Sequence, residues 1–295
     1  MSAAEPPQSA NSASTGGSEA AKPRASGDHT SLLVKARGEG RDIVRVTPQS
    51  AGWRYVGFAA HRLRDGESVG IDQPGDELCI VVLGGTVSVR QRDGGNWARI
   101  GARRDVFDDE APYAVYLPRG RDVAITAHGP AEVGVASAPG PGNASARLIA
   151  PAQMKRFARG TGLNTRYVCD ILPETEPALH LLVVEVRTPS GHSSSYPPHK
   201  HDADDLPQES ALEETYYHRL KPAQGFAFQR VYTDDRALDE ALAVEDHDVV
   251  MVPRGYHPVV VPYGYESYYL NVMAGPRREW HFRNDPAHEW MLEGK

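Results

Sequence analysis

Two halves of this chain resemble each other, and this internal repeat constrains the fold more than any other feature of the sequence. Glu77 opens an apolar segment that parallels the segment beginning at Glu214, 137 residues later. The triplet Pro-Arg-Gly at 118–120 recurs at 253–255, at a separation of 135 residues. Duplication of one domain explains both matches with nearly the same offset. We therefore expect two copies of one domain in the chain.

Each half contains short apolar runs that are separated by Gly, Pro and Asp. Clear examples are the runs at 78–83, 114–117, 180–186 and 249–252. Runs of four to eight residues bounded by turn residues are typical of strands in β-sandwiches and barrels. A helical period is confined to short pieces such as 236–243. The sequence therefore predicts a mostly β protein with few short helices.

The ends of the two copies can be placed from composition. Residues 1–28 are rich in Ala, Ser, Gly and Pro and contain no apolar segment of signal-peptide or membrane-spanning type. Such a segment cannot bury a core, so we expect a disordered tail. The Gly- and Pro-rich stretch 138–143 marks the end of the first copy. The predicted domains are therefore 29–142 and 143–295.

Bulk properties limit the partners and the compartment. The net charge of −7 and the isoelectric point near 5.9 argue against a nucleic acid or an anionic membrane as partner. Only two cysteines occur, Cys79 and Cys169, each within an apolar stretch. This favours a reducing cytoplasm over a disulfide framework. We expect a cytoplasmic protein with a small-molecule partner, and formation of a homo-oligomer stays open.

A metal site is indicated by the motif His199-Lys200-His201. Histidines at positions i and i+2 of a strand point to the same face. A carboxylate on the next strand, Glu214, and a third histidine, His257, would complete a set of three nitrogens and one oxygen. Such a set leaves coordination positions open for a substrate, as catalytic metal sites do.

The first copy lacks these ligands. The segment 69–71, Val-Gly-Ile, stands in the place of His-Lys-His. Glu77 and Asp122 occupy the places of Glu214 and His257, and two carboxylates make a poor site for a transition metal. We therefore expect the first copy to have a structural role.

These motifs resemble a known fold family. A His-x-His strand, a Glu that opens the next strand, and a Pro-x-Gly turn before a third His resemble the two motifs of the cupin barrel. Five segments further resemble the bacterial 5-deoxy-glucuronate isomerases of inositol catabolism, which are similar to the 4-deoxy-hexuronate isomerases: 195–202, 212–219, 228–232, 252–258 and 269–275. The resemblance spans roughly residues 30–290 and is denser in the second half. It implies a duplicated cupin, or bicupin, made of two double-stranded β-helix (jelly-roll) barrels.

The resemblance also implies a function in carbohydrate metabolism. Members of this family are metal-dependent aldose–ketose isomerases, which convert 5-deoxy-D-glucuronate to 5-dehydro-2-deoxy-D-gluconate in myo-inositol degradation. The resemblance implies that a divalent metal ion is held by His199, His201, Glu214 and His257, and Zn or Mn is the expected ion. The register of the family favours Glu214 as the ligand, with Glu213 as the alternative.

Three further residues are candidates for catalytic roles. A uronate needs a cation for its carboxylate, and the planar guanidinium of Arg230 suits this group, although a structural ion pair explains Arg230 equally well. Either Arg230 or Gln229 must face inward, because the two are neighbours on one predicted strand. Tyr216 and Tyr269 are candidates for proton transfer or for binding hydroxyl groups, and aromatic packing is the alternative for both.

Two other functions are compatible with the same ligands. A cupin dioxygenase would hold Fe(II) with the same four side chains and would consume oxygen, which an isomerase does not need. A non-enzymatic sugar-binding or storage cupin would tolerate loss of the ligands. Retention of the ligands in one copy favours chemistry over binding alone.

Overall fold

The structure is a computed structural model that describes residues 31–92, 94–142 and 144–292. The predicted tail at 1–28 lies outside the described residues. The described part falls within one compact unit, Ser31–Lys295. It consists mainly of strands, so the prediction of a mostly β protein is confirmed. Within this part of the chain, no helix is long and apolar enough to cross a membrane.

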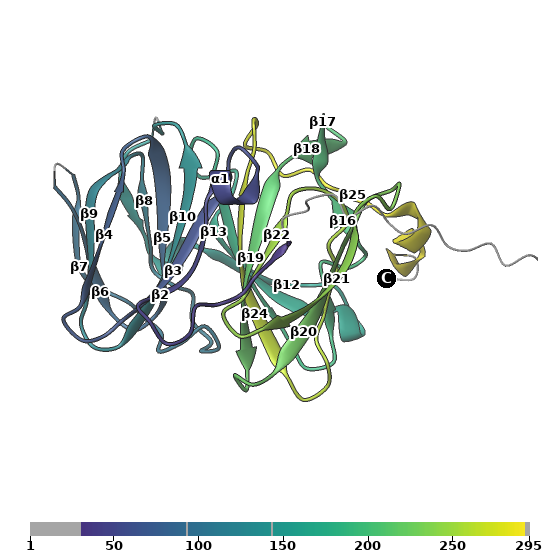
Figure 1. Ribbon diagram of the computed structural model, residues 1–295, viewed down its shortest axis with the longest axis horizontal. Helices are drawn as coiled ribbons and strands as arrows, with labels where there is room; N and C mark the ends of the chain where they lie inside the picture. The colour runs from purple at the N-terminus through teal and green to yellow at the C-terminus, as the bar shows by residue number, and fades with distance from the viewer. Residues whose placement is uncertain (1–30, 93, 143, 293–295) are drawn as a thin grey trace, which may run out of the picture. The chain divides into compact units, whose positions relative to one another are not determined.

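The first half forms a sandwich of two sheets, which we call the first sandwich (Figure 1). Its six-stranded sheet has the order β11 (Arg147–Ile149), β8 (Ala114–Leu117), β5 (Asp76–Gly84), β10 (Ala131–Pro139), β3 (Gly57–Leu63), β2 (Asp42–Val46). Its four-stranded sheet has the order β4 (Ser68–Gln73), β9 (Gly120–Ala127), β6 (Val87–Gln91), β7 (Asn96–Ile100).

The second half repeats this arrangement as the second sandwich. Its seven-stranded sheet has the order β1 (Leu33–Val34), β22 (Val249–Val252), β19 (Glu213–Lys221), β24 (Glu266–Ala274), β14 (Leu182–Thr188), β13 (Arg166–Leu172), β12 (Lys155–Arg159). The facing sheet has the order β15 (Ser193–Ser194), β23 (Val259–Val260), β20 (Phe226–Tyr232), β21 (Asp239–Glu245). Two pairs complete it: β16 (His199–Lys200) with β25 (Arg283–Asn284), and β17 (Asp202–Asp205) with β18 (Glu209–Ala211). The helices are short: α1 (Pro48–Ala51), η1 (Pro151–Gln153), η2 (Gly162–Asn164) and η3 (Pro286–Leu292).

The apolar runs of the sequence correspond to strands that are buried on both faces. In β5, Leu78 and Ile80 face the first core, inside the first sandwich. Cys79 and Val81 point to the opposite face, into a middle core between the two larger sheets. This middle core also contains Leu270 and its neighbours from the second half. A strand between two cores must be apolar at every position, which explains the unbroken run in the sequence.

Two strands cross between the halves. β1 pairs with β22 of the second sandwich, and β11 pairs with β8 of the first. The predicted division into 29–142 and 143–295 stays a prediction. By sequence, β1 belongs to the first of these domains but pairs in the second sandwich, and β11 belongs to the second domain but pairs in the first sandwich.

Two glutamates join the sandwiches in matching ways. The carboxylate of Glu77 accepts backbone N–H groups of residues 179–181 at 2.6–2.8 Å. The carboxylate of Glu213 accepts those of residues 54–56 at 2.7–3.0 Å. Glu77 therefore corresponds to Glu213, and the predicted match with Glu214 was wrong by one residue. Because side chains alternate along a strand, the equivalent of Glu214 is Leu78, which lies in the first core.

Candidate metal centre

Three histidines from distant parts of the chain meet inside the second sandwich. His199 lies on β16, His201 follows directly after it, and His257 follows the Pro-Arg-Gly turn. Their ligand nitrogens all lie within 4.8 Å of one another. The side chains are shielded from water, with exposed fractions of 8%, 2% and 0%. Such a cluster could hold a metal ion.

Glu214 supplies an oxygen to the same place. Its Oε2 lies 3.1 Å from His201 Nε2 and 3.3 Å from His257 Nε2. Glu213 instead points to the other side of β19, where it binds the backbone of 54–56. Of the two alternatives, the structure brings Glu214 to the histidines, because only alternate residues of β19 face the interior.

The imidazole rings are oriented for metal binding. His201 Nδ1 donates to the carbonyl of Leu212 at 3.2 Å, and His257 Nδ1 donates to that of Gly255 at 2.8 Å. In a neutral imidazole, a backbone acceptor on Nδ1 places the proton there and turns Nε2 toward the centre, where the Nε2 atoms of both rings lie near Glu214 Oε2. His257 Nε2 is buried without a hydrogen-bond partner among the described residues. Three imidazole nitrogens and one carboxylate oxygen suit Zn or Mn, so the donor set fits a divalent ion.

Burial keeps most of this cluster neutral. It holds the pKa of His199 well below the usual range, and the neighbouring His257 and His201 add to the effect. Burial also lowers the pKa of His257 to about 4. Burial acts in the same direction on His201, but the hydrogen bond and charge of Glu214 outweigh it and leave the pKa of His201 raised. Neutral imidazole is the form that binds metals.

The turn before His257 depends on a glycine. Gly255 has φ +89°, and a Cβ there would lie 2.4 Å from the carbonyl oxygen of Tyr232. Its N–H donates to Asp202 Oδ2 at 2.7 Å, which ties the turn to the loop after His201. The turn therefore positions His257 through a close backbone approach that only glycine permits.

Substituting Gly255 by alanine is expected to destabilise the protein and to weaken metal binding. The left-handed φ costs about 1–2 kcal/mol, and the clash with Tyr232 adds about 1–3 kcal/mol. Gly264→Ala is the matched control, since Gly264 has φ +94° but open space around its Cβ position. Urea unfolding and metal content measure both effects. Equal losses of stability in the two variants would contradict the role of the close approach.

A substitution pair distinguishes the two neighbouring glutamates. Glu214→Gln is expected to lower metal content with little change in melting temperature. Glu213→Gln is expected to lower melting temperature with metal content retained, because it weakens charge-assisted bonds worth about 1.5–3 kcal/mol each. Metal analysis and thermal unfolding of both variants check this. The opposite pattern would assign the ligand role to Glu213.

Tyr216 and Tyr269 both lie beside the cluster. The Tyr216 ring is 5.7 Å from that of His257 and 4.9 Å from that of Tyr269. Its hydroxyl forms a hydrogen bond with Ser195 Oγ at 3.0 Å. Burial raises the pKa of Tyr216 well above its usual value, with a further contribution from the charge of Glu214. Burial also raises the pKa of Tyr269, so both phenols stay protonated at neutral pH.

Arg230 does not face the cluster, contrary to the expected role as the cation for the substrate. Its guanidinium is exposed and makes a two-pronged ion pair with Asp239, with both N–O distances at 2.8 Å. The inward residue of β20 is Gln229, which is fully buried and accepts from His218 Nε2 at 3.0 Å. Of the two explanations that the sequence left open for Arg230, the structure shows the ion pair.

A cavity of about 390 Å³ lies in the second half of the chain, and its lining includes none of the four candidate ligands. Its lining includes Met273, which is the cross-strand partner of Glu214. It also includes Trp280, whose ring is 6.2 Å from that of Phe282. Phe282 in turn lies 4.7 Å from the His199 ring. Sequence reasoning missed Phe282, because no motif or period marks the segment after β24.

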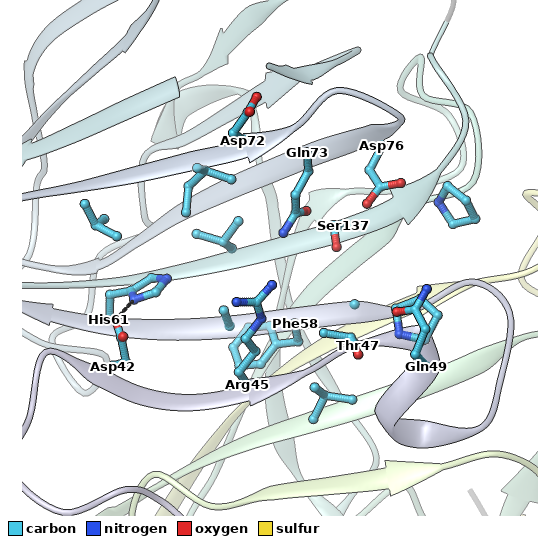
Figure 2. Close-up of a pocket in the computed structure, with 18 of the residues that line it drawn as sticks. Asp42, Arg45, Thr47, Gln49, Phe58, His61, Asp72, Gln73, Asp76 and Ser137 are labelled. Atoms are coloured by element: carbon cyan, nitrogen blue, oxygen red, sulfur yellow. Dashed lines mark hydrogen bonds and ion pairs between the residues drawn. The ribbon is translucent and has the colours of Figure 1, made fainter. Parts of the chain in front are cut away.

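The first sandwich has a pocket of about 440 Å³, between β4 and the edge formed by β2, β3 and β10 (Figure 2). His61 lines it and binds Asp42 Oδ1 through Nδ1 at 2.9 Å. Val69 and Ile71 are buried in the first core, and Asp122 pairs with Arg92. Among the described residues, histidines gather into a potential metal site only in the second sandwich. The structural role of the first copy stays a prediction.

Comparison with known proteins identifies similar chains. A 5-deoxy-glucuronate isomerase of Geobacillus thermodenitrificans (strain NG80-2) is 52% identical over 254 residues, which are 86% of this chain and 92% of that protein. The enzyme of the same name from Bacillus subtilis (strain 168) is 49% identical over 252 residues, 85% of this chain and 93% of that protein. The crystal structure of an IolB-like protein from Salmonella typhimurium LT2 superposes with a TM-score of 0.87 at 48% identity, covering 89% of this chain and all of that chain.

The fold is shared more widely. An oxalate decarboxylase of Lactobacillus farciminis, a protein with the cupin fold, superposes with a TM-score of 0.58 at 12% identity over 86% of this chain and 88% of that chain. The prediction of a duplicated cupin is thereby confirmed. The model of the KduI/IolB family matches residues 32–291. The family model matches nearly all residues that the structure describes, so the chain belongs to the KduI/IolB family.

Proposed function

We propose that this protein is a 5-deoxy-glucuronate isomerase, which converts 5-deoxy-D-glucuronate to 5-dehydro-2-deoxy-D-gluconate. The observation that carries the proposal is the buried cluster of three histidines beside Glu214, in a chain about half identical to enzymes of that name. We propose further that His199, His201, Glu214 and His257 hold a divalent metal ion.

The reaction moves a hydrogen between two neighbouring carbons of an open-chain sugar. When bound, the metal would polarise a carbonyl oxygen and lower the pKa of the adjacent C–H group. Tyr216 and Tyr269, kept protonated by burial, would donate hydrogen bonds to substrate oxygens or deliver a proton. The low exposure of the cluster would keep water from the reacting atoms.

The compartment and the partners belong to the same proposal. Both cysteines are free thiols in the buried interior, which supports a reducing environment such as the cytoplasm. A small uronate as partner suits the cavity of about 390 Å³. Formation of a homo-oligomer stays a prediction.

The decisive experiment uses 5-deoxy-glucuronate in D₂O, with NMR of the product and metal analysis of the protein. We expect conversion without oxygen consumption, loss of activity on chelation, and recovery with Zn²⁺ or Mn²⁺. Deuterium in the product would indicate proton transfer through an exchangeable group, and its absence would indicate a hydride shift. Failure to convert the compound would contradict the proposal, and oxygen consumption would favour the dioxygenase alternative.

A further inference from the structure

Two arginines lie opposite each other inside the second sandwich. Arg166 on β13 and Arg159 on β12 are direct cross-strand partners. Arg166 is in phase with Val168, which belongs to the second core, and Arg159 is in phase with Phe157, which packs against that core. Directly opposed side chains in an antiparallel pair share a face. Both guanidinium groups therefore face the side of the sheet that carries the metal cluster.

Arg166 has no acidic hydrogen-bond or ion-pair partner among the described residues, whereas Arg159 interacts electrostatically with Asp170. Arg166 is only 8% exposed, and its hydrogen bonds go from Nη1 to the main-chain oxygen and Oδ1 of Asn164, both at 3.0 Å. These acceptors are neutral. Arg103, the other buried arginine of the described chain, does have an acidic partner, Glu185. Directly opposed like charges destabilise a sheet, and a buried cation without a partner is costly. An arrangement with both features is typical of a site that binds an anion.

The pair lies within reach of the metal cluster. The guanidinium of Arg159 is 5.3 Å from the centre of the Phe282 ring, which is 4.7 Å from that of His199. Arg159 and His199 are thus at most 10 Å apart, a span that an open-chain six-carbon sugar acid can bridge. Arg159 also lines the cavity of about 390 Å³, together with Lys155 and Asp170.

We propose that Arg159 and Arg166 bind the carboxylate of the uronate substrate, at the end of the sugar opposite to the carbons that react at the metal cluster. This inference rests on the proposed function and assigns the role that the sequence had suggested for Arg230. Two neighbouring guanidinium groups present several N–H donors to one carboxylate, which gives both affinity and orientation. The pair therefore determines specificity for sugar acids over neutral sugars.

The test compares the double variant R159Q/R166Q with the wild-type protein on two substrates, 5-deoxy-glucuronate and its neutral uronamide. We expect KM for the acid to rise on the order of 10- to 100-fold, from the loss of charge-assisted hydrogen bonds. Metal content and KM for the uronamide should change little. R159K/R166K should recover much of the affinity, because it restores both charges. R230Q is the matched control and should keep the wild-type KM, since Arg230 is exposed and bound to Asp239.

The outcomes separate the two proposals. Wild-type turnover combined with an unchanged KM in R159Q/R166Q would overturn the carboxylate site and leave the isomerase function standing. A wild-type protein that does not convert the acid would contradict the proposed function itself. If removal of both buried charges prevents folding, R159Q alone carries the test, because Arg159 is only half-buried. Its KM for the acid must then rise while its KM for the uronamide does not.

Discussion

Replacing His199 and His257 together by alanine is expected to abolish metal binding and to lower kcat/KM by about 1,000-fold or more. These two imidazoles are half of the proposed donor set, and their rings lie 4.9 Å apart. The remaining His201 and Glu214 would form a two-ligand site of low affinity. Metal analysis of the purified variant and steady-state kinetics with 5-deoxy-glucuronate measure both losses.

The control removes two histidines outside the cluster. His281 and His288 are partly exposed, with side-chain exposures of 40% and 35%, and they pair only with surface or nearby acids. The H281A/H288A variant should keep both metal and turnover. Full activity in H199A/H257A would refute the metal site, whereas equal losses in both double variants would indicate a general effect on folding.

The second large effect concerns the interface between the sandwiches. Arg103 comes from the first half and makes a bidentate ion pair with Glu185 of β14, at 2.9 and 2.8 Å. Tyr268 donates a hydrogen bond to the same carboxylate at 2.9 Å. Both charged side chains are almost fully buried, at 4% and 6% exposure. Arg103→Met leaves the Glu185 charge buried without its cation, and we expect a loss of about 3–5 kcal/mol in the free energy of unfolding.

A double variant tests this explanation. R103M/E185L removes both charges and should recover much of the lost stability, because two apolar side chains suit the middle core better than one unpaired carboxylate. The exposed Arg104, whose side chain is 93% accessible, provides the control, and R104M should change stability by less than about 1 kcal/mol. Urea unfolding of all four proteins supplies the measurement. A double variant as unstable as R103M would show that the loss came from packing rather than from charge.

The strands were predictable because their pattern depends on local chemistry. The run Leu78–Leu83 is apolar at every position, and the structure explains this by cores on both of its faces. The duplication was also visible in the sequence. The exact register of the duplication was not visible, because Glu77 could be aligned with either of two adjacent glutamates, Glu213 and Glu214. Which neighbour faces the partner sandwich depends on the phase of β19, and that phase is set by packing between sheets.

The substrate-binding cation shows the same limit. Arg230 was a reasonable candidate because the chemistry of a uronate requires a cation, and guanidinium groups suit carboxylates. Alternation along β20 required either Arg230 or Gln229 to face the interior, and in the structure Gln229 is the buried residue. The inward direction of Arg166 could be inferred from the sequence, because Arg166 stands two residues before the apolar Val168 on the same strand. Its pairing with Arg159 depends on strand register across a turn, which single-residue chemistry does not reveal.

The sequence by itself determined the β architecture, the duplication, the family and the residues that could bind a metal. These properties follow from residue type and spacing along one chain. The tertiary structure decided which glutamate joins the histidines and which side of β20 faces the cluster. It also brought together Arg159 and Arg166, of which Arg166 has no acidic hydrogen-bond partner in the described chain. The physical reason is that side-chain direction alternates with every residue of a strand. The favoured phase depends on cores built from segments more than 100 residues apart, as between Cys79 and Leu270.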